Sequence, residues 1–212
     1  GNGEIGELAE YYFRTDSEHE IVAFTADDKY IKSDTFCELP LIKFQDIKEK
    51  YPPDSYKMFI ALSYSSMNKD RAEKYYKAKE RGYDLVSYVS SNCTFLTENR
   101  VGRNCFILED NTIQPCVRIG NNVTLWSGNH IGHGSRIENH CFISSHVVVS
   151  GNVHIESYCF IGINATLHDN IIIAPETLIG AGAVIAKDTI EKSVYLPPKS
   201  TLINKKSDEI NI

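Results

Sequence analysis

Aliphatic residues at every sixth position constrain this chain more than any other feature. An α-helix does not repeat every six residues, and the stretch lacks the i, i+3, i+4 spacing of an amphipathic helix. A hexapeptide repeat is typical of a β-helix, in which each short side adds one large aliphatic side chain to a continuous interior stack. The positions are Val101, Ile107, Ile113, Ile119, Leu125, Ile131, Ile137, Ile143, Val149, Ile155, Ile161, Leu167, Ile173, Ile179 and Ile185.

The residues beside these anchors also suit a β-helix. Small or β-branched residues stand two positions before most anchors, where an inner corner is crowded. Glycine directly follows the anchors at Gly102, Gly120, Gly132, Gly162 and Gly180, and Asn or Gly recurs at the turns, where unusual φ values are needed. Three sides make one coil, so the stretch predicts about five coils, each rising about 4.8 Å.

Outside the repeat, the order of strand and helix patterns in residues 1–90 predicts a small βαβ-type domain. Gly1, Gly3 and Gly6 form a GxGxxG motif, which belongs on a turn between a strand and a helix, so we expect a first strand that this sequence lacks. We predict domains at 1–90 and 91–190 and a C-terminal tail at 191–212. The expected N-terminal elements are a helix at 7–13, a strand at 20–24, a short helix at 44–51, a strand at 58–62, a charged helix at 71–81 and a strand at 84–89.

This N-terminal region suggests a nucleotide site. The glycines let the backbone approach a phosphate, and Asp27 and Asp28 stand where an acid can hold a ribose hydroxyl. The loop that begins Ser63, Tyr64, Ser65 follows the carboxyl end of a buried strand, where open α/β sheets bind ligands. The domain is about half of a dinucleotide-binding fold and too small for a whole NAD. A tight glycine turn without a ligand is the alternative.

Net charge and cysteine usage indicate which partners and which cellular compartment to expect. A net charge of −6 and a pI near 5.7 give no basic footprint for nucleic acid, so we expect a small-molecule or protein partner. No apolar run approaches a membrane span, and no signal peptide is visible. Of six cysteines, Cys105, Cys141 and Cys159 share one inner-corner phase of the repeat. We interpret them as reduced core residues of a cytoplasmic protein.

Six of the seven histidines lie in the repeat, and none is on an anchor position. They should therefore point outward or occupy corners, where a solvated surface role is the alternative to chemistry. The segment from Trp126 to Gly134 stands out because it combines His130 and His133 with an indole and small residues. A histidine with a pKa near neutrality is a natural general base.

Together, the half-Rossmann domain and the hexapeptide repeats resemble the bacterial sugar acyltransferases. This family includes sialic acid O-acetyltransferases, the UDP-4-amino-sugar N-acetyltransferase type and perosamine N-acetyltransferase. The resemblance implies a left-handed parallel β-helix, which periodicity alone does not give. It also implies an acetyl-CoA-dependent enzyme that N-acetylates a nucleotide-linked amino sugar for a bacterial surface polysaccharide such as lipopolysaccharide, as a homotrimer with sites at subunit interfaces. O-acetylation of sialic acid or a related sugar is the alternative.

The resemblance also assigns roles to particular residues. The family carries a catalytic His followed by an acid, and an S/C-G-[GN] element 17 residues later. Ser150-Gly151-Asn152 provides that element and places the base at His133, with His130 and His146 as alternatives. Gly134 stands where the acid is expected, so Glu138 or a carboxylate of an adjacent subunit would have to orient the imidazole.

Acetyl-CoA in this family runs along the solenoid, where small residues make room for its pantetheine arm. Gly151, Gly162, Gly180 and Ala181 match those places, and Lys187 would meet phosphates. Backbone N–H groups near Gly151 would supply an oxyanion site. Turn geometry alone is the alternative for the glycines. In the first domain, a loop followed by Arg71 loosely resembles the sugar-nucleotide loop, but it lacks the usual glycine and paired asparagines, which leaves the nucleotide open.

Three competing functions have weaker support. A γ-type carbonic anhydrase needs three His ligands, two of them about five residues apart, but the spacings here are 3, 7, 6, 8 and 14, and Asp169 stands two coils after His133. We therefore expect no metal. An NAD-dependent oxidoreductase has no use for five coils of solenoid. A non-enzymatic β-helix scaffold leaves the cluster around His133 without a role.

Overall fold

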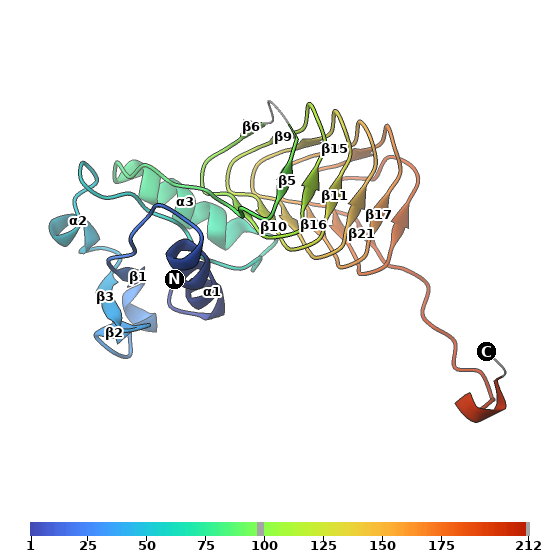
Figure 1. Cartoon of the computed structure of the whole chain (residues 1–212), viewed down its shortest axis with the longest axis horizontal. Coiled ribbons are helices and arrows are strands. Elements are labelled where there is room, and N and C mark those ends of the chain that lie inside the picture. The colour runs from blue at the N-terminus through green and yellow to red at the C-terminus, as the bar shows by residue number, and fades with distance from the viewer. Residues whose placement is uncertain (97–99, 211–212) are drawn as a thin grey trace.

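The computed structural model describes residues 1–96 and 100–210, so the parts of the predicted β-helix at 97–99 and of the predicted tail at 211–212 lie outside it. Three parallel sheets form a left-handed β-helix, as the repeat and the resemblance predict (Figure 1). The seven-stranded sheet contains β4 (Tyr88–Val89), β7 (Phe106–Ile107), β10 (Thr124–Leu125), β13 (Phe142–Ile143), β16 (Phe160–Ile161), β19 (Leu178–Ile179) and β21 (Val194–Tyr195). The six-stranded sheet contains β5 (Thr94–Phe95), β8 (Thr112–Ile113), β11 (His130–Ile131), β14 (Val148–Val149), β17 (Thr166–Leu167) and β20 (Val184–Ile185). The five-stranded sheet contains β6 (Arg100–Val101), β9 (Arg118–Ile119), β12 (Arg136–Ile137), β15 (His154–Ile155) and β18 (Ile172–Ile173).

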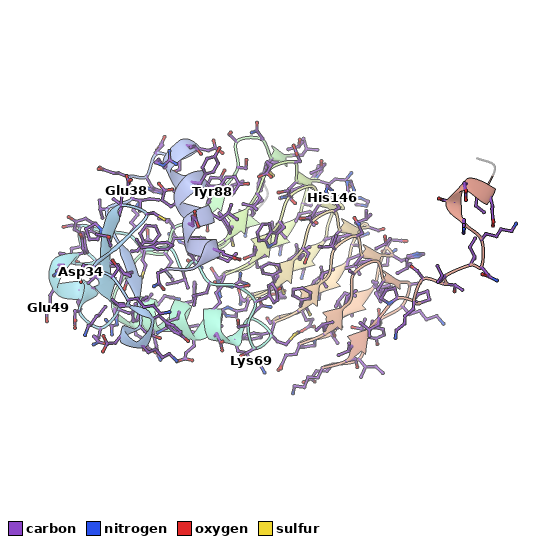
Figure 2. The ribbon with its side chains drawn as sticks, turned by 90° about the horizontal axis from the view of Figure 1, so that it is seen from below. Asp34, Glu38, Glu49, Lys69, Tyr88 and His146 are labelled. Carbon is purple, nitrogen blue, oxygen red and sulfur yellow. The ribbon has the colours of Figure 1, made fainter. Side chains whose placement is uncertain are left out.

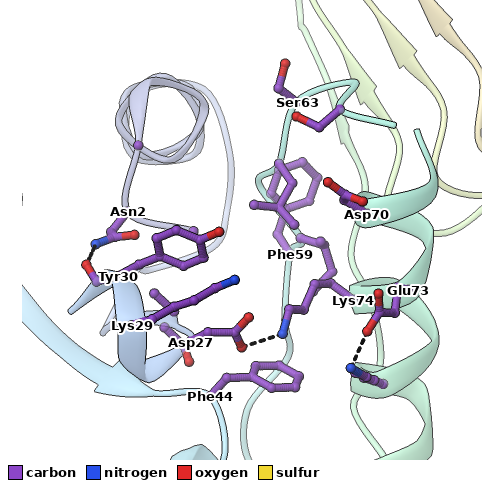
Figure 3. Close-up of a pocket in the computed structure, with 18 residues that line it drawn as sticks. Asn2, Asp27, Lys29, Tyr30, Phe44, Phe59, Ser63, Asp70, Glu73 and Lys74 are labelled. Carbon is purple, nitrogen blue, oxygen red and sulfur yellow. Dashed lines mark hydrogen bonds and ion pairs between the residues drawn. The ribbon is translucent and has the colours of Figure 1, made fainter. Parts of the chain in front are cut away.

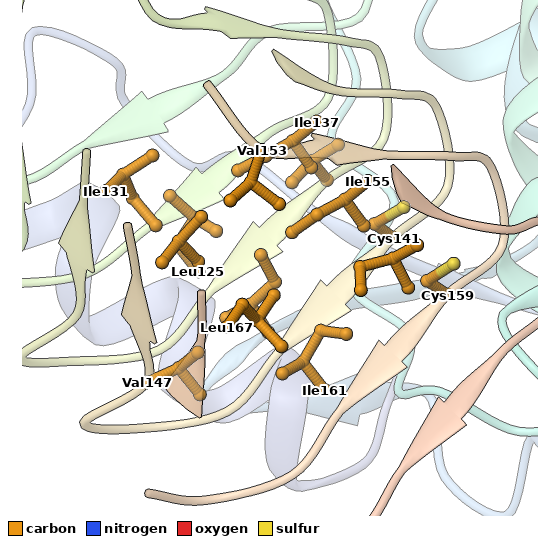
Figure 4. Close-up of a cluster of buried hydrophobic side chains, with 14 of the residues drawn as sticks. Leu125, Ile131, Ile137, Cys141, Val147, Val153, Ile155, Cys159, Ile161 and Leu167 are labelled. Carbon is orange, nitrogen blue, oxygen red and sulfur yellow. The ribbon is translucent and has the colours of Figure 1, made fainter. Parts of the chain in front are cut away.

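Strand register confirms the 18-residue coil. Leu125 pairs with Ile107 on one side and Ile143 on the other, and the other two sheets repeat this offset. Because every third hexapeptide returns to the same sheet, identical inward positions stack on one another. Figure 4 shows these aliphatic side chains converging between the three sheets, with Cys141 and Cys159 at one inner corner.

The interior of the β-helix is a continuous stack of buried apolar side chains. From Ile107 to Ile185 the anchor side chains are at most 6% exposed, and most are fully buried. Burying a side chain of this size stabilises the fold by about 1.5–3 kcal/mol, so the stack dominates the stability of this part. All six cysteines are free thiols, and the three on the inner-corner phase are buried as predicted, whereas Cys116 is exposed.

In the N-terminal region, the observed helices match the predicted ones better than the observed strands do. The helices are α1 (Glu4–Thr15), α2 (Ile47–Lys50), α3 (Lys69–Glu80) and the 3-10 turn η1 (Asp28–Tyr30). The strands are β1 (Phe24–Ala26), β2 (Thr35–Phe36) and β3 (Leu39–Lys43), which form a small sheet of order β1-β3-β2. The strand predicted at 20–24 therefore begins only at Phe24, and β2 and β3 were not predicted.

The segment predicted as a strand at 58–62 pairs with the chain at only one residue. Met58 bridges Leu85, and no ladder continues from there. Instead, the Asn104 side chain of the β-helix accepts a hydrogen bond from Ile60 N–H at 2.7 Å, so a side chain provides the pairing that a neighbouring strand would. Beside this segment lies a groove of about 440 Å³, lined by α1, residues 19–25 and residues 55–61.

Two helices attach the N-terminal region to the outer face of the seven-stranded sheet. Phe13 of α1 packs against Tyr88, and Tyr88 packs against Phe106, with ring centroids 5.6 Å apart in both pairs. On α3, Tyr76 contacts the corner residue His140, and Lys69 forms an ion pair with Glu176. The resulting apolar and polar contacts hold the two regions in one arrangement.

The C-terminal segment extends from the end of the β-helix opposite the N-terminal region (Figure 1). After β21 it contains only the 3-10 turn η2 (Ser207–Glu209), and Leu202 is 95% exposed. Among the described residues, no helix is long and apolar enough to cross a bilayer.

Candidate functional site

His133 lies in the turn that joins β11 of the six-stranded sheet to β12 of the five-stranded sheet. Gly132 is buried, and Gly134 adopts a φ of +69°, so the chain turns sharply around an exposed imidazole. The backbone N–H of His133 donates to Oε1 of Gln114 at 2.9 Å, and the ring Nδ1 lies 3.4 Å from the same oxygen. Gln114 follows β8, one coil earlier, and was not among the predicted site residues.

Gly151 lies beneath the imidazole of His133. A Cβ atom at position 151 would stand 2.6 Å from Cε1 and 2.9 Å from Nε2 of His133, so a side chain there would displace the imidazole. The N–H of Gly151 makes no hydrogen bond to any residue in the ranges 1–96 and 100–210. A basic ring nitrogen and an unused backbone donor are thus adjacent, as general-base chemistry at a carbonyl requires.

The corner that carries His133 continues along the β-helix. Asn152 N–H donates to His133 C=O, and Asn170 N–H donates to Gly151 C=O, so successive coils present His133, Gly151 and Asp169 in one column. The pairing of β17 with β20 extends this column to Lys187, three coils beyond His133 and about 14 Å away at the usual strand spacing. The predicted base and the predicted phosphate-binding lysine therefore share one edge.

The two alternative bases occupy other environments. His130 is on β11 and points outward between Thr112 and Val148, the facing residues of the neighbouring strands. His146 is exposed at the corner that follows β13, where its ring lies over Gly128. In Figure 2, His146 lies on the side of the β-helix opposite Lys69 of α3.

His140 is buried by the N-terminal region. Nδ2 of Asn122 lies 2.9 Å from Nδ1 of His140, and the Tyr76 hydroxyl lies 2.9 Å from its Nε2. Burial, together with the positive charge of Arg71, lowers the pKa of His140 to about 4. His140 is therefore a neutral structural residue at neutral pH.

Glu138 does not orient His133. Its Oε1 lies 3.0 Å from Nε2 of His154 on the adjacent strand, with which it forms an ion pair when the imidazole is protonated. Of the orienting groups suggested by the sequence, this one is contradicted by the geometry. The reason is register: Glu138 follows β12, and its outward face belongs to the five-stranded sheet.

Residues predicted to bind CoA are divided between two corners. Gly151 and Lys187 share the corner of His133, whereas Gly162, Gly180 and Ala181 follow strands of the seven-stranded sheet and lie at the next corner. A Cβ at Gly162 would stand 2.5 Å from the backbone N of Ala181. Close packing between coils therefore requires Gly162, whatever else it binds.

The N-terminal region contains a second candidate site, a cavity of about 510 Å³ between the loop at the start of α1 and helix α3 (Figure 3). Five predicted residues line it: Gly1, Gly3, Asp27, Ser63 and Ser65. The cavity is also lined by residues that were not predicted, among them Thr25, Lys29, Tyr30, Lys74 and Lys77.

Charges in this cavity are largely paired. The Lys74 ammonium donates to the carboxylate of Asp27. Lys77 pairs with Glu73, which lies one turn earlier on α3. Lys29 lies 4.8 Å from the ring centre of Tyr30. The hydroxyl of Thr25 is buried and has no hydrogen-bond partner in the described part of the chain. The N-terminus of α1 adds a positive dipole end, which favours an anion.

Four predicted substrate residues do not line the cavity. Gly6 is buried in α1, where an added Cβ would stand 2.4 Å from the Gly1 carbonyl oxygen, so close packing explains it. Asp28 forms an exposed ion pair with Lys43, and the ring of Tyr64 packs on Phe142 and Phe160. The fourth, Arg71, is buried between α3 and the β-helix.

Arg71 is 2% exposed and connects α3 to the seven-stranded sheet. Its guanidinium donates to Oγ1 of Thr124 and to the carbonyl oxygen of Cys141, the latter at 3.0 Å, and it lies over the Phe142 ring. Burial lowers its pKa to about 10, which leaves it charged at neutral pH. Its Nε has no partner among the described residues. Arg71 therefore positions the two regions and does not reach the cavity.

Among the described residues, no group of three or more His, Cys, Asp or Glu side chains is placed to hold a metal ion.

Comparisons with known proteins agree with this architecture. The family model described as bacterial transferase hexapeptide (six repeats) matches residues 117–151 and 152–187. No curated protein sequence matches the chain. Among solved structures, a variant of perosamine N-acetyltransferase from Caulobacter crescentus, in complex with CoA and GDP-perosamine, superimposes with a TM-score of 0.80 at 18% identity over 93% of this chain and 91% of that one.

Two further structures show the same fold. WeeI from Acinetobacter baumannii gives a TM-score of 0.75 at 21% identity, over 90% of this chain and 89% of that one. The acetyltransferase domain of PglB from Neisseria gonorrhoeae gives a TM-score of 0.62 at 16% identity, over 93% and 94%. The likeness extends over the N-terminal region as well as the hexapeptide repeats.

Proposed function

We propose that this chain, whose residues 117–151 and 152–187 match the bacterial transferase hexapeptide model, is an acyl-CoA-dependent acyltransferase acting on a nucleotide-linked amino sugar. The observation that carries the proposal is the corner at which the imidazole of His133 lies over Gly151, next to an unused backbone N–H. The complex of perosamine N-acetyltransferase with CoA and GDP-perosamine, which has the same fold, supports the substrate class.

In the proposed reaction, an amino group of the sugar attacks the thioester carbonyl of acyl-CoA. Nε2 of His133 takes the proton that the nitrogen loses as the C–N bond forms. The N–H of Gly151 donates to the carbonyl oxygen as negative charge develops there. The tetrahedral intermediate then collapses, the C–S bond breaks, and the proton held by His133 passes to the departing thiolate. The products are the acylated sugar nucleotide and CoA.

The shared edge of His133 and Lys187 supports a direction for acyl-CoA. With the thioester at His133, a CoA molecule along this corner would pass Gly151 and bring a phosphate toward the ammonium of Lys187. Gly151 has no side chain on this path, so an extended pantetheine arm can lie close to the backbone there, whereas the next coil presents Asp169. Gly162, Gly180 and Ala181 lie at another corner, so they would serve this role only on a face turned toward a neighbouring chain.

The cavity of the N-terminal region would bind the nucleotide part of the acceptor. It offers the N-terminus of α1 and Lys29 to a phosphate group, and Lys74 and Lys77 could exchange their present carboxylate partners for one. None of the residues that line it belongs to the β-helix. This separation favours a homotrimer in which a sugar nucleotide held by one chain reaches the histidine corner of its neighbour, so that each site lies at a subunit interface.

The test is thiol release from acetyl-CoA with UDP-, dTDP- and GDP-linked amino sugars, and with sialic acid as a hydroxyl acceptor. We expect release with one amino sugar and its loss in His133→Ala, while CoA binding measured by calorimetry is retained. His154→Ala removes an imidazole on β15 of the five-stranded sheet, away from this corner, and should leave the rate unchanged. Release with a hydroxyl acceptor alone would establish O-acylation instead, and undiminished turnover in His133→Ala would refute the assigned base.

A further inference from the structure

The side chain of Gln114 contacts His133 at two points. Its Oε1 accepts the backbone N–H of His133 at 2.9 Å and lies 3.4 Å from the ring Nδ1. Gln114 is itself held by the β-helix, because its backbone N–H donates to the carbonyl oxygen of Ile131. A residue on the preceding coil therefore controls both the backbone and the ring of the histidine.

The backbone contact identifies which amide atom faces the histidine. A backbone N–H is always a donor, so the atom that it meets must be the oxygen of the Gln114 amide and not its NH₂ group. The same oxygen then faces Nδ1. Because an amide oxygen only accepts hydrogen bonds, this contact favours the tautomer of neutral His133 that carries its proton on Nδ1. Nε2, the atom beside Gly151, is left with its lone pair.

In the described part of the chain, no carboxylate is placed to orient the imidazole of His133. Gly134 follows the histidine, Glu138 is engaged with His154, and Asp169 lies two coils further along the same corner. An amide and a carboxylate act differently here. Both orient the ring, but a negative charge also raises the pKa of the imidazole, whereas a neutral amide does not.

We propose that Gln114 is a positioning residue that holds His133 in the Nδ1–H tautomer and presents Nε2 to the acceptor. The catalytic consequence rests on the proposed function, whereas the tautomer is a property of the free protein. Gln114 acts from the neighbouring coil, whereas the residue that directly follows the histidine in the chain is Gly134.

His140 provides an internal reference for the test. Nδ2 of Asn122 must donate to Nδ1 of His140, since the oxygen of the Asn122 amide already accepts from Nδ2 of Asn104 at 2.8 Å. His140 is therefore the Nε2–H tautomer, opposite to that inferred for His133. Both tautomers should be visible in one spectrum of the same protein.

The first experiment is NMR of ¹⁵N-histidine-labelled protein without substrate, with the ring signals assigned by His133→Asn and His140→Asn. At a pH where His133 is neutral, we expect Nδ1–H for His133 and Nε2–H for His140. In Gln114→Ala, His133 should become a mixture of tautomers while His140 is unchanged. Gln45→Ala, which removes the other glutamine of the chain from an exposed position, should change neither the His133 nor the His140 tautomer. A wild-type His133 in the Nε2–H form, or a tautomer unaffected by Gln114→Ala, would overturn the proposal.

The second experiment uses turnover. Gln114→Ala should lower kcat by about 10- to 100-fold with little change in the KM for acetyl-CoA, because an orienting partner is lost and a binding group is not. Gln114→Glu should restore most of kcat and move the acidic limb of the pH–rate profile to higher pH, as the new carboxylate raises the pKa of His133. A profile that does not move would count against the contact. If the wild-type protein transfers no acyl group, the proposed function fails while the NMR result still decides the role of Gln114.

Discussion

The imidazole of His133 occupies the space that a side chain at Gly151 would fill, with Cε1 only 2.6 Å from the position of an added Cβ. Gly151→Ala should therefore displace the ring and lower kcat at least about 10-fold, since a misplacement of about 1 Å is costly for catalysis. Its φ lies outside the left-handed region, so the backbone accepts alanine and the melting temperature should change little. Steady-state kinetics and thermal unfolding measure both effects.

A double-mutant cycle distinguishes this effect from a direct role of Gly151 in CoA binding. In the His133→Ala background no ring remains to be displaced, so Gly151→Ala should cause little further loss of activity. Fully additive losses would mean that Gly151 acts independently of His133.

Stability should depend on pH through His140. Its pKa is about 4 in the folded protein and near 6.5 when unfolded, so between these values the unfolded chain binds the extra proton. The contribution of neutral His140 to the free energy of unfolding is fully present above about pH 6.5. It is lost as the pH drops toward 4, by up to about 3 kcal/mol. Urea unfolding at pH 7.5 and pH 5 measures this. His140→Gln, which does not titrate, should lose less stability over the same interval, and an equal loss in both proteins would contradict the assignment.

Arg71 should stabilise the contact between α3 and the β-helix. Arg71→Ala leaves a cavity and deprives the Asn68 side chain of a donor, so we expect a loss of about 2–5 kcal/mol in the free energy of unfolding. Arg71→Met fills most of the space without a buried charge and should cost less. Equal stability of Arg71→Ala and wild type in urea would show that the buried guanidinium does not hold the two regions together.

Inward-facing and outward-facing positions of the β-helix should differ sharply in their tolerance of substitution by alanine. Ile143 is fully buried, and Ile143→Ala should cost about 2–5 kcal/mol. Ile172 points outward from β18 and is 45% exposed, so Ile172→Ala should change stability by no more than about 0.5 kcal/mol in the isolated chain. A larger effect for Ile172→Ala that depends on protein concentration would place this residue in an interface between chains.

Lys74 should contribute to the binding of a nucleoside diphosphate in the N-terminal cavity. Replacing it with Ala removes a cation and frees the Asp27 carboxylate, so affinity measured by calorimetry should fall about 10-fold or more at low salt and less at high salt. Lys79→Ala, on the same helix but outside the cavity, is the matched control. Equal effects of the two changes would exclude this cavity as the nucleotide site.

Only part of the N-terminal region could be predicted from the sequence. The helical periodicity of α1 and α3 and the positive φ of Gly82 after α3 follow from local propensity and capping. The segment at 58–62 reads as a strand because it is apolar. However, its backbone is satisfied by Asn104, a residue more than 40 positions away, and no local pattern reveals such a partner.

The candidate site also contains residues whose positions follow from the sequence and residues whose positions do not. The spacing from His133 to Gly151 is one coil of the repeat, so their proximity follows from the sequence once the 18-residue coil is recognised. The position of Gln114, one coil and one residue before His133, could have been found from the same register. Arg71 was assigned to substrate because the loop before it loosely resembles the sugar-nucleotide loop of the bacterial sugar acyltransferases. Its burial depends on how α3 meets the β-helix.

The sequence by itself determined the β-helix, its coil length and the edge on which His133 and Gly151 lie, because a strict period fixes which residues stack on one another. Only the tertiary structure decided which histidine is buried, which carboxylate is already engaged and which lysines face the cavity. Those outcomes depend on contacts between segments far apart in the chain, where the docking of α1 and α3 on one sheet sets burial and charge. Periodicity carries no information about that docking.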